Sequence, residues 1–133
     1  MLHTEINLQD TENYRSFMRF ALKYADRIGV YYTSDFSAFK ESRWYELLSE
    51  SIIGHEYSER GVLCLFLKID HVTVGWLKEK KDIFDFMQTD DGDYLWDICF
   101  YKDGSEVFST VTHERLSYIS EEMLREYDAM SLD

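Results

Sequence analysis

The side chains in this sequence that could most readily take part in binding or catalysis are carboxylates, and several of them lie between residues 82 and 94. The stretch surrounds two aromatic residues with five acids: Asp82, Asp85, Phe86, Asp90, Asp91, Asp93 and Tyr94. An aromatic anchor inside a charged rim is typical of surfaces that hold a protein partner. We therefore predict that these seven residues form a partner-binding site for a basic protein. The alternative is that Phe86 is buried and the acids only aid solubility.

Metal binding and catalysis have weaker support in the sequence. The acidic run at residues 90–93 lacks the alternating ligands and final Glu of an EF-hand loop. The pairs His55-Glu56 and His113-Glu114 are not part of an H-E-x-x-H motif, and neighbours on a strand point to opposite faces. No nucleophile elbow or glycine-rich phosphate loop is present. We predict no metal, no cofactor and no catalytic residue, so a His/Glu-dependent enzyme is the weakest alternative.

Basic side chains recur at every fourth position near the start of the chain: Arg15, Arg19, Lys23 and Arg27. This spacing places them along one ridge of a helix. The ridge is interpreted either as an ordinary solvated face or as an anion-binding or docking surface. Its pairing with acids of a second copy would produce a homodimer, which stays open as an alternative.

The net charge of −12 is unevenly distributed. Residues 82–133 hold fourteen Asp and Glu against three Lys and Arg. Such a field favours a basic partner and disfavours direct contact with nucleic acid or an anionic membrane. A nuclease or another nucleic-acid-binding protein would offer a suitable cationic groove.

Length and composition predict one domain over residues 1–133. The chain is 45% hydrophobic and 17% aromatic, which is enough for a packed core. It shows no leader-like start and no apolar run of the roughly 20 residues that cross a bilayer, so we expect a cytoplasmic protein. Cys64 and Cys99 lie in apolar runs, and we expect two reduced, buried thiols.

Apolar periodicity predicts the first elements. Residues 11–28 have helical spacing, with Asp10 or Thr11 as the N-cap and Gly29 as the end. Residues 30–33 are typical of a short strand, and residues 37–53 of a second helix that Gly54 would cap.

The central region predicts a hairpin. Residues 62–69 form a continuous apolar run typical of a central strand, and Asp70-His71 would turn the chain into a partner strand at 72–77. A short helix at 78–88 and a loop at 89–93 would follow.

The C-terminal third has the clearest β signal. Residues 94–101 and 106–112 predict a hairpin around Gly104, residues 112–119 are ambiguous, and Ser120 would cap a helix to about residue 130. The expected order is α-β-α-ββ-α-ββ-α. This order predicts an α+β fold with a mainly antiparallel sheet of two hairpins plus a short strand, covered by three to four helices.

These features together favour a small acidic protein-binding module. It would occlude the basic surface of a partner, as an inhibitor, an immunity-type protein or an antitoxin-type protein does. The alternative is a self-associating structural or regulatory subunit that inhibits no partner.

Overall fold

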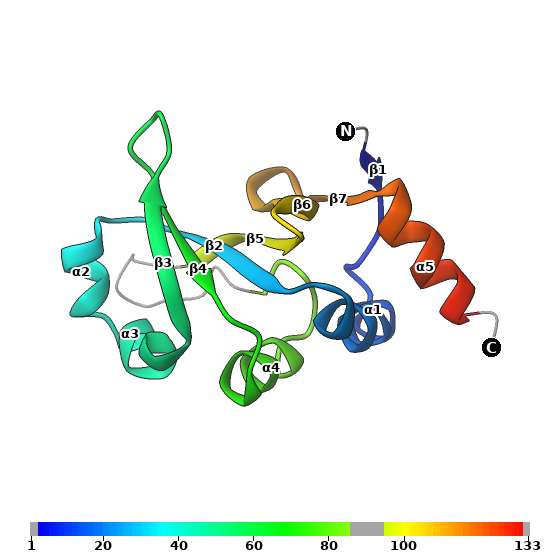
Figure 1. The fold of residues 1–133 in the computed structure, drawn as a ribbon, viewed down its shortest axis with the longest axis horizontal. Coiled ribbons are helices and arrows are strands. Elements are labelled where there is room, and N and C mark those ends of the chain that lie inside the picture. Colours follow the sequence, from blue (N-terminus) through cyan, green and yellow to red (C-terminus); the bar gives the residue numbers. More distant parts are fainter. Residues whose placement is uncertain (1–2, 86–94, 132–133) are drawn as a thin grey trace.

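A computed structural model describes residues 3–85 and 95–131. In these ranges, seven strands form one sheet in the order β1-β7-β6-β5-β2-β4-β3, and every neighbouring pair is antiparallel (Figure 1). The strands are β1 (His3–Glu5), β2 (Arg27–Tyr32), β3 (Ile52–Tyr57), β4 (Leu63–Leu67), β5 (Leu95–Lys102), β6 (Ser105–Val111) and β7 (Leu116–Ser120). The predicted α+β class is confirmed.

Within the described residues, five α-helices and two short 3₁₀ helices pack with this sheet. They are α1 (Thr11–Tyr24), α2 (Phe36–Lys40), α3 (Arg43–Leu48), α4 (His71–Lys78), α5 (Glu121–Ser131), η1 (Ser49–Ser51) and η2 (Thr112–Glu114). In Figure 1, α1 and α4 lie next to each other, and α5 runs down from the end of β7.

The core lies between the helices and one face of the sheet. On β2, alternate residues Ile28 and Val30 are fully buried, as are Phe17 and Met18 of α1. Tyr32 is buried as well, and Tyr31, between Val30 and Tyr32, is only partly buried. This period-two burial is the pattern of a sheet that has one face against helices.

The first helix begins as predicted but ends earlier. The Asp10 carboxylate caps it by accepting from the Glu12 N–H at 3.3 Å, whereas the helix stops at Tyr24 and Gly29 belongs to β2. A Cβ at Gly29 would lie 2.8 Å from Tyr101 Cε2. The glycine is therefore explained by the close approach of a tyrosine ring on the neighbouring strand and not by a helix end.

The predicted single helix at 37–53 is interrupted after α2 and ends before Ile52. Two short helices, α2 and α3, are followed by η1, and then the edge strand β3 pairs with β4. Gly54 lies opposite Phe66 in that pairing, so it caps no helix. The ladder to β4 and the stacking of His55 on Phe36, with ring centroids 4.0 Å apart, stabilise the strand. β3 and β4 are consecutive strands joined by residues 58–62, whereas Phe36 comes from the more distant α2.

The predicted strand at 72–77 is helix α4. The Asp70 carboxylate accepts from the N–H groups of Val72 and Thr73 at 3.0 and 3.1 Å, and the Thr73 hydroxyl accepts from the Asp70 N–H at 3.0 Å. This reciprocal capping box starts a helix where a hydrophobic run alone would fit a strand. Because α4 ends at Lys78, the predicted helix at 78–88 is absent from residues 79–85, which end in a turn.

The C-terminal predictions are confirmed. Strands β5 and β6 form the hairpin, with Asp103 and Gly104 at φ values of +52° and +82° in its turn. Ser120 caps α5 by accepting from the Met123 N–H at 3.2 Å. The ambiguous segment supplies η2 and β7, and β7 pairs with an unpredicted strand, β1. None of the helices in the described ranges has the length and apolar character needed to traverse a bilayer.

Candidate acid-lined binding site

Most of the predicted partner site lies outside the described residues: Phe86, Asp90, Asp91, Asp93 and Tyr94. Asp82 and Asp85 are described, and both occupy the turn after α4. The Asp82 carboxylate accepts from the Phe84 N–H at 2.7 Å, and that of Asp85 accepts from the Lys81 N–H at 3.0 Å. These two acids therefore hold a turn together, and the seven-residue site stays a prediction.

Other acids of the C-terminal half are spread over several elements. Asp97, at a bulge in β5, accepts from the Thr112 N–H at 2.7 Å. Glu106 lies on β6, where burial raises the pKa of its carboxyl group. One cavity within the described residues brings several of these acids together. Its acidic lining residues are Asp103, Glu122 and Glu126.

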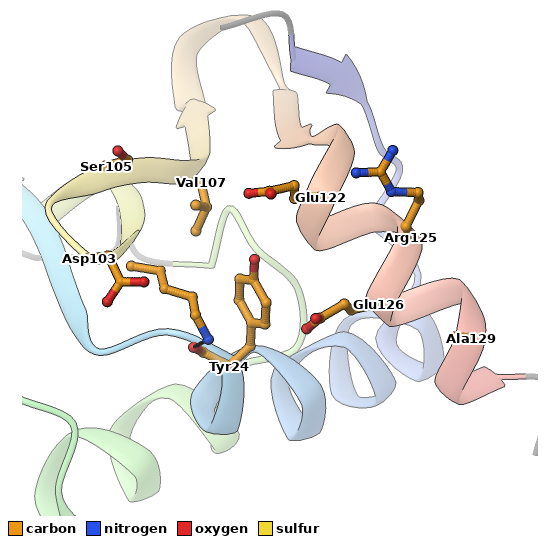
Figure 2. A pocket seen from close by; sticks show the side chains of 9 residues that line it. Tyr24, Asp103, Ser105, Val107, Glu122, Arg125, Glu126 and Ala129 are labelled. Carbon is orange, nitrogen blue, oxygen red and sulfur yellow. Dashed lines mark hydrogen bonds between the residues drawn. The ribbon is translucent and has the colours of Figure 1, made fainter.

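This cavity has a volume of about 510 Å³ and lies between α5, the β5–β6 hairpin and the end of α1. Figure 2 shows Glu122 and Glu126 reaching from α5 toward the hairpin, with the Tyr24 ring between α5 and Asp103. Val107 also lines the cavity and is 4% exposed. An arginine or lysine side chain would thus meet three carboxylates, an aromatic ring and an apolar wall.

The local sequence explains the position of the β5–β6 hairpin, which forms one side of the cavity. The left-handed turn at Asp103-Gly104 reverses the chain within two residues, as the twist of a tight hairpin requires. The Asp103 N–H donates to the Asp26 carboxylate at 2.8 Å, and the Asp26 N–H donates to the Tyr101 carbonyl at 2.9 Å. The turn is therefore fixed to the segment that follows α1.

The opposite side of the cavity is formed by α5, whose residue spacing places one face on the core and another on the cavity. Met123 is fully buried and holds one side of the helix against the core. Glu122, Glu126 and Ala129 are spaced by four and three residues, so they share the side that lines the cavity. Both glutamates are exposed.

Two bases, Lys102 and Arg125, also line the cavity. Lys102 Nζ donates to the Tyr24 carbonyl at 3.2 Å and lies 4.1 Å from the centroid of the Tyr24 ring. Arg125 lines the cavity from α5. Among the described residues, neither the Glu122 nor the Glu126 carboxylate forms an ion pair or a hydrogen bond.

The electrostatic effect of these acids converges on one phenol. The pKa of Tyr24 is raised above its usual value, mainly by burial and then by the charges of Glu126, Glu122 and Asp103. Three carboxylates, two from α5 and one from the hairpin turn, therefore all raise the pKa of Tyr24. A cation entering the cavity would be favoured by this potential.

The other sequence candidates do not come together. His55 stacks on Phe36 at the sheet edge, whereas His113 lies in η2 with its ring 5.4 Å from that of Trp96. Within the described ranges, no group of three or more His, Cys, Asp or Glu is arranged to hold a metal ion. Cys64 and Cys99 are buried and free, as predicted.

The basic row is interrupted by the fold. Arg15, Arg19 and Lys23 are exposed on α1, but Arg27 belongs to β2. Its guanidinium lies between the rings of Phe66 and Tyr101, at 4.5 and 4.6 Å from their centroids. The predicted four-residue ridge is therefore wrong at its last member, because the helix ends three residues earlier.

The sequence reasoning missed Tyr24, Lys102 and the pair Glu122 and Glu126. The i, i+4 spacing of the two glutamates was visible in the sequence, whereas the approach of the hairpin to α1 depends on tertiary contacts. Comparison with known proteins adds no family, because no family model, no curated protein and no solved structure matches the chain.

Proposed function

We propose that this protein binds a basic protein and receives one of its arginine or lysine side chains in the acid-lined cavity. The observation that carries the proposal is the pair Glu122 and Glu126, two carboxylates without a partner among the described residues, at a cavity of about 510 Å³. Like charges one helical turn apart destabilise a helix. An external cation would remove that repulsion and gain charge-assisted hydrogen bonds.

The mechanism is occlusion without a chemical step. The acidic field accelerates encounter with a cationic surface, and burial of the inserted side chain slows dissociation. The face of the Tyr24 ring that Lys102 already contacts illustrates how a cation is held there. A nuclease or nucleic-acid-binding protein is the class of partner we favour, with this protein as an inhibitor of the immunity or antitoxin type.

A second candidate function is self-association through the edge of the sheet. Three large apolar side chains on or just before the edge strand β3 are exposed: Leu47 at 45%, Ile53 at 55% and Tyr57 at 47%. An edge strand with apolar side chains is suited to pairing with another strand. This candidate predicts a homodimer that resists salt, whereas capture of a basic partner weakens with salt.

Affinity capture from the native source tests the main proposal. The double variant Glu122→Gln with Glu126→Gln should lose a basic partner that the wild-type protein retains at low salt. A matched control, Glu114→Gln with Glu121→Gln, removes two exposed charges from the same half of the chain but outside the cavity. Equal retention by the two double variants would contradict the proposal, since net charge alone would then explain binding.

A further inference from the structure

A second hollow lies along α1, toward the helix start and beside α4. Its volume is about 200 Å³, and it is lined by Tyr14, Arg15, Met18, Arg19 and Lys78. Tyr14 and Met18 are 0% and 1% exposed, so they form a closed floor. Arg15 lies nine residues before Tyr24, or two and a half turns, so the two side chains leave α1 on opposite sides. The hollow is therefore separate from the acid-lined cavity.

The rim of this hollow is cationic and uncompensated. Arg15 and Arg19 are one turn apart on α1, and Lys78 is the last residue of α4. Among the described residues, none of the three forms an ion pair, a hydrogen bond or a ring contact. Three such charges around one hollow repel each other, although the chain as a whole carries a charge of −12. A bound anion would relieve that repulsion.

Acids near the floor do not provide this anion. Asp82 and Asp85 contribute, after the larger effect of burial, to the raised pKa of Tyr14, so they lie within electrostatic range of it. Their carboxylates accept backbone N–H groups of the turn at residues 81–84, and the Tyr14 hydroxyl donates to the Leu77 carbonyl. Neither acid forms an ion pair with Arg15, Arg19 or Lys78, so these cations can still bind an external ligand.

The combination of rim and floor defines the class of ligand. Two guanidinium groups one turn apart can donate to both oxygens of a carboxylate. The apolar floor and the alkyl stems of the three cations suit a hydrocarbon chain. A volume of about 200 Å³ corresponds to roughly seven water-sized groups. We propose that this hollow binds a small organic carboxylate with a short alkyl chain.

Titration with hexanoate, followed by amide chemical shifts in NMR spectra, tests this proposal. Hexanoate should produce saturable shifts at Tyr14, Met18 and Lys78, while acetate, which lacks the chain, and 1-hexanol, which lacks the charge, should not. The variant Arg15→Gln with Arg19→Gln should weaken hexanoate binding at least about tenfold, as expected for the loss of charge-assisted hydrogen bonds.

The matched control is Lys23→Gln with Arg60→Gln, which removes two exposed cations that do not line the hollow. It should bind hexanoate like the wild-type protein. Equal shifts with 1-hexanol, or an equal loss of affinity in both double variants, would overturn the proposal. Neither result bears on the acid-lined cavity, whose ligand has the opposite charge.

Discussion

Replacement of Asp70 by alanine is the sharpest test of how α4 forms. The Asp70 carboxylate accepts from the N–H groups of Val72 and Thr73, and from the hydroxyl of Ser51 at 2.8 Å from Oδ2 and 3.0 Å from Oδ1. Ser51 is fully buried. The substitution therefore removes a helix cap and leaves a buried hydroxyl without this partner.

The expected cost has two parts. Loss of the N-cap destabilises by about 1 kcal/mol. Loss of the partner of a buried hydroxyl costs about 1–3 kcal/mol. We expect Asp70→Ala to lower the free energy of unfolding by about 2–4 kcal/mol. Asp70→Asn should cost less, because asparagine also caps helices and keeps one acceptor oxygen.

Urea unfolding followed by circular dichroism gives the comparison. Asp35→Ala is the matched control, since Asp35 caps the five-residue α2 with one bond, from the Ala38 N–H at 2.8 Å, and it is exposed. This control should cost about 1 kcal/mol or less. If Asp70→Ala were no more destabilising than Asp35→Ala, the reasoning about the capping box and Ser51 would be refuted.

The acidic side of the stability profile checks the same carboxylate. Burial alone would raise the pKa of Asp70, but hydrogen bonds from Thr73, Ser51 and Val72 outweigh it, and the pKa falls below 3.8. A carboxylate with a lowered pKa stabilises the fold above its unfolded pKa, and the contribution is lost as pH falls through the folded value. The difference between wild type and Asp70→Ala should therefore shrink below about pH 3.8.

Three further variants probe the sheet and its buried groups. In urea unfolding, Gly29→Ala should destabilise the fold by about 1–3 kcal/mol, because the new Cβ meets Tyr101. Gly75→Ala in α4, where the new Cβ has nothing within 4 Å, should stabilise the fold by about 0.5–1 kcal/mol. Equal effects of the two substitutions would contradict this packing. Burial raises the pKa of Glu106 above 4.5, so the fold loses stability as pH rises from 4.5 through the pKa of the folded state. Glu106→Gln should remove this pH dependence of stability. An unchanged pH profile in the variant would refute the role given to Glu106. Burial raises the pKa of Cys64 to about 11 and that of Cys99 well above 9.0. At pH 8 both thiols should react with iodoacetamide at least about a hundredfold more slowly in the folded than in the unfolded chain, and comparable rates would exclude their burial.

Local signals in the sequence were sufficient for part of the fold. The spacing of Tyr14, Phe17 and Met18 predicted α1, and the turn residue Gly104 predicted the β5–β6 hairpin. Ser120 predicted the start of α5. In each of these elements the stabilising contacts are close in sequence, so composition and periodicity are enough to predict its type and position.

The wrong predictions have both local and tertiary causes. Residues 72–77 fit either a strand or a helix by hydrophobicity, and the reciprocal bonds of Asp70 and Thr73 decide for the helix. Gly29 and Gly54 resemble helix ends, but Gly29 lies in a strand whose partners are distant in sequence, and Gly54 lies in the β3–β4 hairpin. The acid-lined cavity was missed because α5 and the hairpin meet there only in three dimensions.

The central claim is that unpaired carboxylates in this cavity bind a cationic side chain. Titration of the protein with N-acetyl-arginine amide, followed by amide chemical shifts in NMR spectra, tests it directly when the neutral citrulline analogue is the control. We predict shifts at Tyr24, Val107 and Ala129 with the arginine compound alone, weakened by salt and abolished in Glu122→Gln with Glu126→Gln. Equal shifts with the citrulline analogue, or shifts that persist in this double variant, would contradict the account.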